Sequence, residues 1–349
     1  VYTSGTTGYP KGVLHSHRSL IGRKPATDFW FDFKENDRIM HSGKFNWTYV
    51  LGSALMDPLF NGHTVIAYEG ANDASTWINL IKKHQCTIFI GVPTIYRQII
   101  QKTDFTLDDC PSLRYCMSAG EHLSDEMLGL WRDRFKQDIY EAIGMSECSY
   151  YISHSKNNPI RPGSAGFPQP GHIVKLLDPE TLEEVGVEEE GMICIGEDDP
   201  GLFLEYWQLE EETLKSRHDG YFFTGDYARK DKDGYIWFIG RKDDIINTFG
   251  FRVSPHEIER VVKTHADVAD CVAFGLDIEK EKTIVAIAVV GHSTISKEKE
   301  QEILKFAQNN LAKYKAPKEI FIMSDYTRTK NGKVLRKQLV KDLHEQYFA

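Results

Sequence analysis

Residues 1 to about 240 alternate short apolar runs with longer segments in which apolar residues recur at helical spacing. The runs that predict buried strands are Thr64–Tyr68 and Cys86–Gly91, and the segments that predict helices are Ala74–His84 and Ser124–Phe135. In the second helix we expect Leu128, Leu130 and Trp131 to face the core. This alternation of strands and helices favours a layered α/β fold.

A Pro/Gly-rich passage at Pro159–Pro170 predicts a loop. The β-type segments expected after it are His172–Leu177, Met192–Gly196 and the hairpin-like Asp231–Gly240. A second pattern then begins with a capping box at Ser254–Glu257 and an amphipathic helix. The elements expected beyond it are the strands Ala269–Gly275 and Thr283–Gly291, the helix Lys297–Lys313 with Ile303, Phe306 and Ala307 inward, and the strand Glu319–Ser324. The sequence thus predicts a large domain, residues 1–240, and a small α+β domain, residues 241–349.

The composition narrows the classes of function. The 349 residues carry a formal net charge of −9 and are 41% hydrophobic, which is typical of a globular protein. An acidic balance argues against nucleic acid or an anionic membrane surface as partner, and the longest apolar run, Thr283–Val290, is too short to cross a bilayer. Six cysteines without metal-type spacing are expected to be reduced, buried thiols of a cytoplasmic protein.

The strongest chemical signal is the segment Thr3–Gly12, TSGTTGYPKG. Its three glycines let the backbone turn its N–H groups toward one point, while four hydroxyls and Lys11 add donors and a positive charge. These groups suit a polyphosphate. The segment is neither a Walker A loop nor a dinucleotide-binding fingerprint.

This segment resembles the phosphate loop of the AMP-forming acyl-CoA synthetases of the adenylating superfamily. The later motifs follow in the order of that family: Ser118–Glu121, Glu141–Glu147, Tyr221–Asp226, Gly240–Asp244, Phe249–Arg252 and Asn331–Lys333 with Arg336. Because the family places a sizeable subdomain before the phosphate loop, and residue 1 is Val, we expect the N-terminal portion of the large domain to be missing.

The resemblance implies that ATP, Mg²⁺ and CoA are used with a carboxylic acid, and it assigns a role to each motif residue. The implied ATP-binding residues are Thr3, Ser4, Gly5, Thr6, Thr7, Gly8, Lys11, Gly120, Glu121, Glu141, Ala142, Ile143, Gly144, Met145, Ser146, Asp226, Arg241 and Lys333. The other implied roles are Lys333, Glu147 and Lys11 in catalysis, Glu147 on Mg²⁺, Phe249, Gly250 and Phe251 on CoA, Arg252 near the phosphate, and Asp243 at a hinge between the domains.

Two departures bear on the substrate. The family usually has an aromatic residue against adenine where this chain has Ile143. Benzoate-type CoA ligases share the isoleucine, so the chain resembles them at this position. Gly144 stands where acetyl-CoA synthetases carry Trp, so we expect an acyl pocket open to a medium-chain or aromatic acid. Phe45, Trp47 and Tyr49 either line that pocket or belong to the core.

The sequence leaves several alternatives open. A luciferase-like oxidation, transfer to a carrier protein and an inactive fragment remain alternatives to thioester formation. The identity of the acid, the pathway and the oligomeric state are not settled by the sequence.

Overall fold

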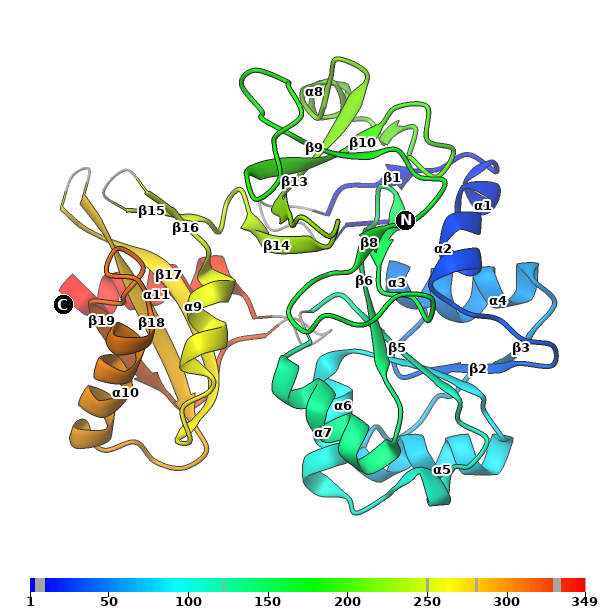
Figure 1. Cartoon of the computed structure of the whole chain (residues 1–349), viewed down its shortest axis with the longest axis horizontal. Coiled ribbons are helices and arrows are strands. Elements are labelled where there is room, and N and C mark those ends of the chain that lie inside the picture. Colours follow the sequence, from blue (N-terminus) through cyan, green and yellow to red (C-terminus); the bar gives the residue numbers. More distant parts are fainter. Residues whose placement is uncertain (4–9, 122, 249–250, 280–281, 329–333, 349) are drawn as a thin grey trace. The chain divides into compact units, whose positions relative to one another are not determined.

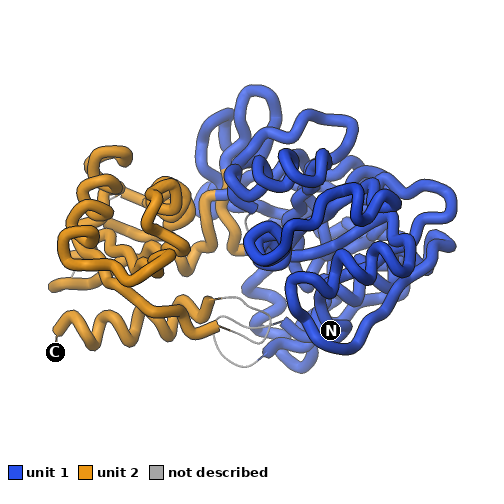
Figure 2. The backbone as a smooth tube through the Cα atoms, turned by 90° about the horizontal axis from the view of Figure 1, so that it is seen from below, with its two compact units in different colours: residues 1–224, 229–238 blue, residues 225–228, 239–349 orange. Residues whose placement is uncertain are grey.

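The computed structural model describes residues 1–3, 10–121, 123–248, 251–279, 282–328 and 334–348. These residues form two compact units (Figure 2), the first made of residues 1–224 and 229–238 and the second of residues 225–228 and 239–349. The fold is mixed α/β, as predicted, with a small α+β unit at the C-terminal end (Figure 1). No helix among the described residues has the length and apolar character needed to cross a membrane.

The helical elements of the first unit come mainly from its first half. They are α1 (Ser19–Gly22), α2 (Lys24–Phe29), α3 (Thr48–Leu51), the π-helical η1 (Gly52–Met56), α4 (Asp57–Phe60), α5 (Ala74–His84), α6 (Pro93–Lys102), the 3-10 turn η2 (Leu107–Asp109), α7 (Asp125–Phe135) and α8 (Glu210–Lys215). The strands are β1 (Val13–Leu14), β2 (Arg38–His41), β3 (Thr64–Ile66), β4 (Ile88–Gly91), β5 (Tyr115–Ala119), β6 (Ile139–Met145), β7 (Ser149–Ser153), β8 (Phe167–Pro168), β9 (Val174–Leu177), β10 (Glu190–Gly196), β11 (Glu205–Tyr206), β12 (Arg217–His218), β13 (Tyr221–Lys230) and β14 (Ile236–Arg241), the last two of which run into the second unit.

The main sheet of the first unit has the order β3-β2-β4-β5-β6-β7-β8. Strands β3 to β6 are parallel, whereas β7 and β8 are antiparallel additions. Helices α5, α6 and α7 pack in a row along this sheet (Figure 1). Because Ala119 at the end of β5 is in register with Ala142 on β6, the chain segments that follow these two strands leave the same edge of the sheet, where ligands of parallel sheets bind.

The helix α7 corrects one expectation. Leu128 and Trp131 are buried, as predicted, but Leu130 is 44% exposed. Residues two apart on a helix point about 200° from each other, so Leu130 cannot share the face of Leu128. Met127 and Phe135 complete the buried stripe instead.

The second unit is a three-stranded sheet covered on both faces. Its elements are β15 (Ile246–Thr248), β16 (Phe251–Val253), α9 (Pro255–Val262), β17 (Val268–Glu279), β18 (Lys282–Gly291), α10 (Lys297–Asn310), β19 (Glu319–Met323) and α11 (Arg336–Phe348). Alternate residues of β17 and β18 pack against α9 and α10 on one face and against α11 on the other. This is why both strands read as continuous apolar runs in the sequence.

Two expectations for the second unit change in detail. Ser254 accepts the N–H of Glu257, as the capping box predicts, whereas the Glu257 carboxylate accepts hydrogen bonds from Lys315 Nζ, at 2.6 and 2.8 Å. The helix predicted to reach Lys313 ends at Asn310, because Leu311 is extended, and Phe306 is only half-buried.

Candidate active site

Glu147 lies in the turn between β6 and β7 and is 6% exposed. Tyr206 donates its hydroxyl to Glu147 Oε1 at 2.8 Å, and the Phe203 N–H donates to the Glu147 carbonyl at 2.7 Å. The ammonium of Lys11 lies 4.8 Å from the centre of the Tyr206 ring and pairs with Glu212 at 2.7 Å. Lys11 and Glu147, which are far apart in the sequence, therefore meet at the same tyrosine.

Tyr206 is the functional candidate that motif reasoning missed. It lies on β11, which pairs with β1 directly after the phosphate-loop segment, with Val13 opposite Tyr206. The available signal was the aromatic pair Tyr206–Trp207 shortly after the apolar run Leu202–Leu204, which by itself predicts only a strand.

The phosphate-loop segment is closed at its base. The Thr3 N–H donates to the Lys11 carbonyl at 2.9 Å, and the Lys11 N–H donates to Thr3 Oγ1 at 3.2 Å. The predicted residues Ser4, Gly5, Thr6, Thr7 and Gly8 lie outside the described residues. The two ends of the segment are thus brought together, with Lys11 on the side toward Tyr206.

The end of β5 contributes Gly120 and Glu121. Gly120 has φ +88°, and a Cβ there would lie 3.1 Å from the ring of Trp47, so the indole covers its backbone. Glu121 accepts a hydrogen bond from Thr94 at 3.1 Å. Of the three aromatics considered for the acyl pocket, Tyr49 belongs to the core at 6% exposure, Trp47 is half-buried, and Phe45 is exposed.

The end of β6 contributes Ile143 to Ser146, with the strand residues Glu141 and Ala142 buried before them. Ser146 is held by His15, whose Nε2 is 2.7 Å from the Ser146 carbonyl oxygen, and by Thr48, whose hydroxyl is 3.3 Å from that of Ser146. Burial lowers the pKa of His15, so its imidazole is neutral near pH 7. The next residue along the chain is Glu147.

Gly144 is required by the backbone. The ladder between β6 and β7 shifts register between Ile143 and Gly144, and a Cβ on Gly144 would lie 2.2 Å from the Ser149 carbonyl oxygen. The sequence interpretation explained this glycine by the size of an acyl pocket. The hairpin itself already excludes a side chain there in this conformation.

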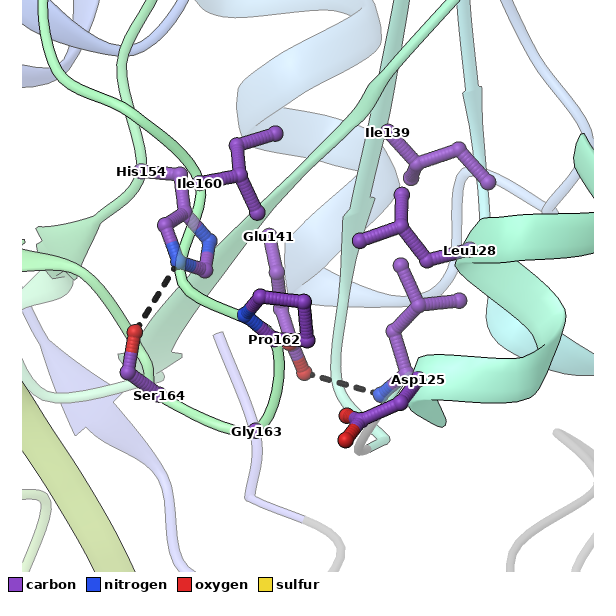
Figure 3. Close-up of a pocket in the computed structure, with 10 residues that line it drawn as sticks. Asp125, Leu128, Ile139, Glu141, His154, Ile160, Pro162, Gly163 and Ser164 are labelled. Carbon is purple, nitrogen blue, oxygen red and sulfur yellow. Dashed lines mark hydrogen bonds between the residues drawn. The ribbon is translucent and has the colours of Figure 1, made fainter. Parts of the chain in front are cut away.

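A small cavity of about 10 Å³ is lined by Glu141, by the start of α7 and by the loop that follows β7 (Figure 3). Glu141 accepts the Leu123 N–H at 3.0 Å, and His154 Nε2 lies 3.2 Å from the Ser164 hydroxyl. Burial lowers the pKa of His154. A volume of this size holds about one water molecule, so this cavity is not the acid-binding pocket.

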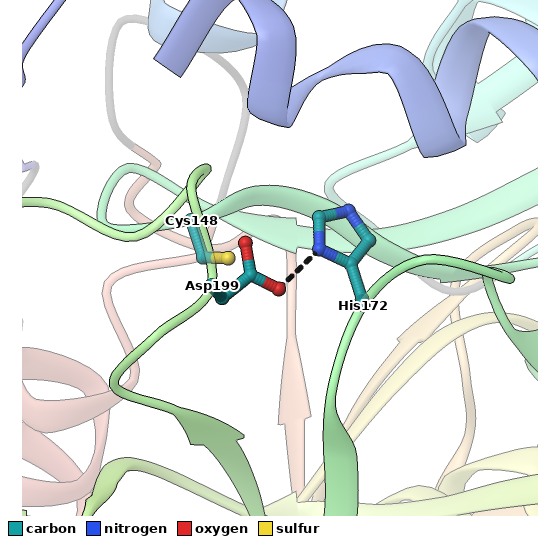
Figure 4. Close-up of side chains that lie close together, drawn as sticks. All are labelled: Cys148, His172 and Asp199. Atoms are coloured by element: carbon teal, nitrogen blue, oxygen red, sulfur yellow. Dashed lines mark hydrogen bonds and ion pairs between the residues drawn. The ribbon is translucent and has the colours of Figure 1, made fainter. Parts of the chain in front are cut away.

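Cys148, His172 and Asp199 lie close together with buried side chains (Figure 4). Cys148 directly follows Glu147 in the chain. His172 Nδ1 and Asp199 Oδ2 are 2.6 Å apart, and Asp199 Oδ1 accepts the Gly201 N–H at 2.8 Å. Ligand atoms around a tetrahedral zinc ion are about 3.3 Å apart. The 2.6 Å separation is therefore that of a direct hydrogen bond, which ties the loop before β9 to the loop after β10.

Asp226 and Arg241 pair within the second unit. Arg241 Nε is 3.3 Å from Asp226 Oδ1, next to Gly225, whose φ is +79°. Asp243, the predicted hinge residue, pairs with Lys337 at 3.4 Å. The Asp226–Arg241 pair brings together the motif Tyr221–Asp226 and the motif Gly240–Asp244.

The predicted CoA-facing segment is described only in part. Phe249 and Gly250 lie outside the described residues. Phe251 is 50% exposed and stacks on Tyr314 at 4.6 Å between ring centres, and the Arg252 guanidinium lies 5.6 Å from the Tyr227 ring.

Lys333 also lies outside the described residues. Arg328 and Arg336, on either side of residues 329–333, both contact described residues of the second unit. Arg328 bridges to Val334 and donates to Asp270 at 2.9 Å. On the other side, Arg336 pairs with the buried carboxylate of Glu259. Through Asp270, Arg328 anchors the chain before this segment to β17.

Comparison with known proteins places these features in a family. The model of the AMP-binding enzyme family matches residues 1–207, and that of the AMP-binding enzyme C-terminal domain matches residues 257–333. The chain is 31% identical to human mitochondrial acyl-coenzyme A synthetase ACSM3, over 97% of this chain and 59% of that protein. It is 32% identical to 3-hydroxybenzoate–CoA ligase of Aromatoleum sp., over 97% of this chain and 65% of the ligase.

Solved structures agree over nearly the whole chain. ATP-bound MatB from Rhodopseudomonas palustris superposes with a TM-score of 0.90 at 29% identity, covering 99% of this chain and 68% of MatB. The anthranilate CoA ligase AuaEII in complex with anthranoyl-AMP gives a TM-score of 0.90 at 28% identity, covering 100% of this chain and 67% of that one. The chain thus spans about three fifths of the length of the curated relatives above and belongs to the AMP-binding enzyme family.

Proposed function

We propose that this protein activates a carboxylic acid with ATP and transfers the acyl group to CoA. The observation that carries the proposal is that Lys11 and Glu147 both contact Tyr206. It supports Lys11 as the cation for phosphate and Glu147 as the carboxylate for a hard metal ion. The relatives support it, since their names describe CoA ligases of aromatic and other carboxylic acids. We propose a medium-chain or aromatic acid as substrate, and residues 1–240 and 241–349 as the functional domains.

The reaction has two steps. A carboxylate oxygen forms a bond to the α-phosphorus while the bond to the β-phosphate oxygen breaks, giving acyl-adenylate and pyrophosphate. The CoA sulfur then bonds to the acyl carbon, its proton leaves to solvent, and AMP departs. No side-chain nucleophile is needed, so the protein acts by orientation and by charge compensation.

The proposed roles follow the family motifs and the charge of each side chain. Lys11 binds the phosphates, Asp226 the ribose hydroxyls together with Arg241, and Ser146 and the end of β6 lie along the nucleotide. We assign Lys333 to the charge between the carboxylate and the α-phosphate, where a positive group offsets their repulsion. We assign Phe249, Gly250 and Phe251 to CoA, Arg252 to the phosphate and Asp243 to the hinge.

Glu147 fits a magnesium ion by its chemistry. It offers carboxylate oxygens in a buried turn, with the Tyr206 hydroxyl fixing the orientation of Oε1. When bound, Mg²⁺ neutralises phosphate charge. The contribution of this chain is to hold the Glu147 carboxylate in place through the Tyr206 hydroxyl. The proposal also assigns the protein to the cytoplasm, supported by six cysteines that are all free and buried.

The proposal is tested by pyrophosphate release from ATP with a panel of medium-chain acids, benzoate and aminobenzoate. We expect pyrophosphate release to depend on the acid. We also expect CoA to convert the acyl-adenylate to a thioester without uptake of O₂. Lys333→Ala abolishes adenylation but spares thioester formation from supplied acyl-adenylate, whereas Lys330→Ala in the same segment is a matched control. Pyrophosphate release that no acid stimulates contradicts the proposal. Oxygen uptake, or acyl transfer to a carrier protein in place of CoA, favours the corresponding alternative.

A further inference from the structure

The turn between β6 and β7 carries two proposed nucleotide-site residues, Ser146 and Glu147, and ends at a strained position. Ser149 has φ +65°, in the left-handed region that a non-glycine residue adopts at a cost. Such a conformation persists when neighbouring groups hold it. The group that holds it here is the guanidinium of Arg23, which donates from Nη1 to the Ser149 hydroxyl.

Arg23 is itself fixed by a buried ion pair. Its Nε lies 2.5 Å from Asp57 Oδ1 and its Nη2 lies 2.6 Å from Asp57 Oδ2, a two-bonded arrangement that sets the plane of the guanidinium. The side chains of Arg23 and Asp57 are 10% and 2% exposed. The guanidinium also lies 5.4 Å from the centre of the Tyr150 ring, next to Ser149.

Two glycines bring the surrounding backbone close to Arg23 and to the residue before it. A Cβ on Gly52 would lie 2.1 Å from Arg23 Nη2, so the arginine occupies the space of a missing side chain. A Cβ on Gly22 would lie 2.2 Å from the Gly201 backbone nitrogen, which fixes the chain just before Arg23. The same loop that holds Gly22 continues to Phe203, whose N–H binds the Glu147 carbonyl.

We infer that Arg23 is a positioning residue for the nucleotide site, acting through Ser149 on the turn that presents Ser146 and Glu147. This inference rests on the proposed function. A guanidinium with two bonds to Asp57 and one to Ser149 sets the end of the turn relative to η1 and α4. Without the bond to Ser149, the turn relaxes from its left-handed end and the nucleotide-facing groups shift.

The first test removes only the acceptor. Ser149→Ala loses the hydroxyl, while Ser149→Asn supplies an amide oxygen in a residue that tolerates the left-handed region. We expect Ser149→Ala to weaken equilibrium binding of ATP, and of AMP without metal, by about tenfold, the size of one hydrogen bond to a charged group. Ser149→Asn is expected to restore most of the affinity. The midpoint of thermal unfolding is measured in parallel, because a merely structural role would move that midpoint and leave affinity unchanged.

The second test removes the ion pair without leaving a buried charge. The double variant Arg23→Met with Asp57→Leu replaces both partners by apolar groups, which is often close to neutral for stability. We expect it to fold and to bind ATP about tenfold more weakly. Lys24→Gln is the matched control, since Lys24 pairs with Asp28 on the exposed face of the same helix.

The outcomes separate the two claims. Parent-like nucleotide affinity in Ser149→Ala, or in the folded double variant, overturns the inference while leaving the proposed function intact. Loss of affinity in Lys24→Gln equal to that in the double variant also overturns it. A parent chain that binds neither ATP nor AMP contradicts the proposed function itself. Weakened binding in both Arg23-linked variants, with rescue by Ser149→Asn, supports the inference.

Discussion

Replacing Glu259 by Gln removes a buried charge that balances Arg336, whose side chain is 21% exposed, in the second unit. Glu259 is 6% exposed on α9, and its Oε1 accepts hydrogen bonds from Arg336 and, at 2.9 Å, from the Ala273 N–H. Arg336 in turn donates to the Ala273 carbonyl at 3.0 Å. Because β17 is an edge strand, this ion pair satisfies backbone groups that have no strand beside them.

The expected cost is large because the pair is buried. Breaking one partner of a buried ion pair costs about 3–5 kcal/mol, since the remaining charge is left uncompensated. Domains are stable by about 5–15 kcal/mol in total, so the second unit loses a substantial share of its stability. For a domain of this size the loss corresponds to a fall in Tm of roughly 10–20 °C.

The pH dependence has a definite sign. Burial alone would raise the pKa of Glu259, but Arg336 and His256 outweigh it and hold the pKa below its ordinary range. The unfolded carboxyl binds its proton with a pKa of about 4.3. The stabilisation is therefore fully present above that pH and is lost as the pH falls toward the lower pKa of the folded state. The stability difference between parent and Glu259→Gln is therefore expected to shrink as the pH falls below about 4.

Amide hydrogen exchange of α9, β17 and α11 follows the second unit directly. All six tryptophans lie in the first unit, so their fluorescence reports that unit separately. Lys299→Gln is the matched control, because Lys299 and Asp267 form a partly exposed pair that is worth about 0–1 kcal/mol. A loss of under 1 kcal/mol in Glu259→Gln, or one equal to that of Lys299→Gln, would refute the reasoning.

Three glycine substitutions are predicted to differ in sign under urea unfolding. Gly22→Ala is expected to destabilise by about 1–3 kcal/mol, because its Cβ meets the Gly201 backbone at 2.2 Å. Gly144→Ala meets the Ser149 carbonyl at the same distance, and we expect a similar loss together with weaker ATP binding in an equilibrium titration. Gly129→Ala, on α7 with nothing within 4 Å of its Cβ, is expected to stabilise by about 0.5–1 kcal/mol. Equal effects at the three positions would contradict these predictions.

Local elements were predictable where the sequence carries both periodicity and end signals. The helix expected at Ala74–His84 is observed with those bounds, since Asp73 caps its first turn and Gln85 ends it in a left-handed conformation. The helix expected to reach Lys313 ends at Asn310, because the backbone becomes extended at Leu311. Helix-forming residue types nevertheless continue beyond that point in the sequence. Propensity alone does not mark that point.

The support of the site could not be predicted, because its contacts join distant segments. Tyr206 reaches Glu147 across 59 residues, and Arg23 reaches Ser149 across 126. Neither Tyr206 nor Arg23 belongs to a recognisable motif, and an arginine in a polar segment normally suggests a solvated surface. The motif residues themselves were identifiable because their chemistry is local, as with the hydroxyls and glycines around Lys11.

The central claim, that the carboxylate attacks the α-phosphorus of ATP, is tested most directly with an acid whose carboxylate carries ¹⁸O. In the proposed reaction one carboxylate oxygen becomes the bridging atom of the acyl-adenylate and leaves with AMP when the thiol attacks. Mass spectrometry of the products should therefore find one ¹⁸O in AMP and none in pyrophosphate. Label in phosphate or pyrophosphate, or formation of ADP in place of AMP, would contradict the account.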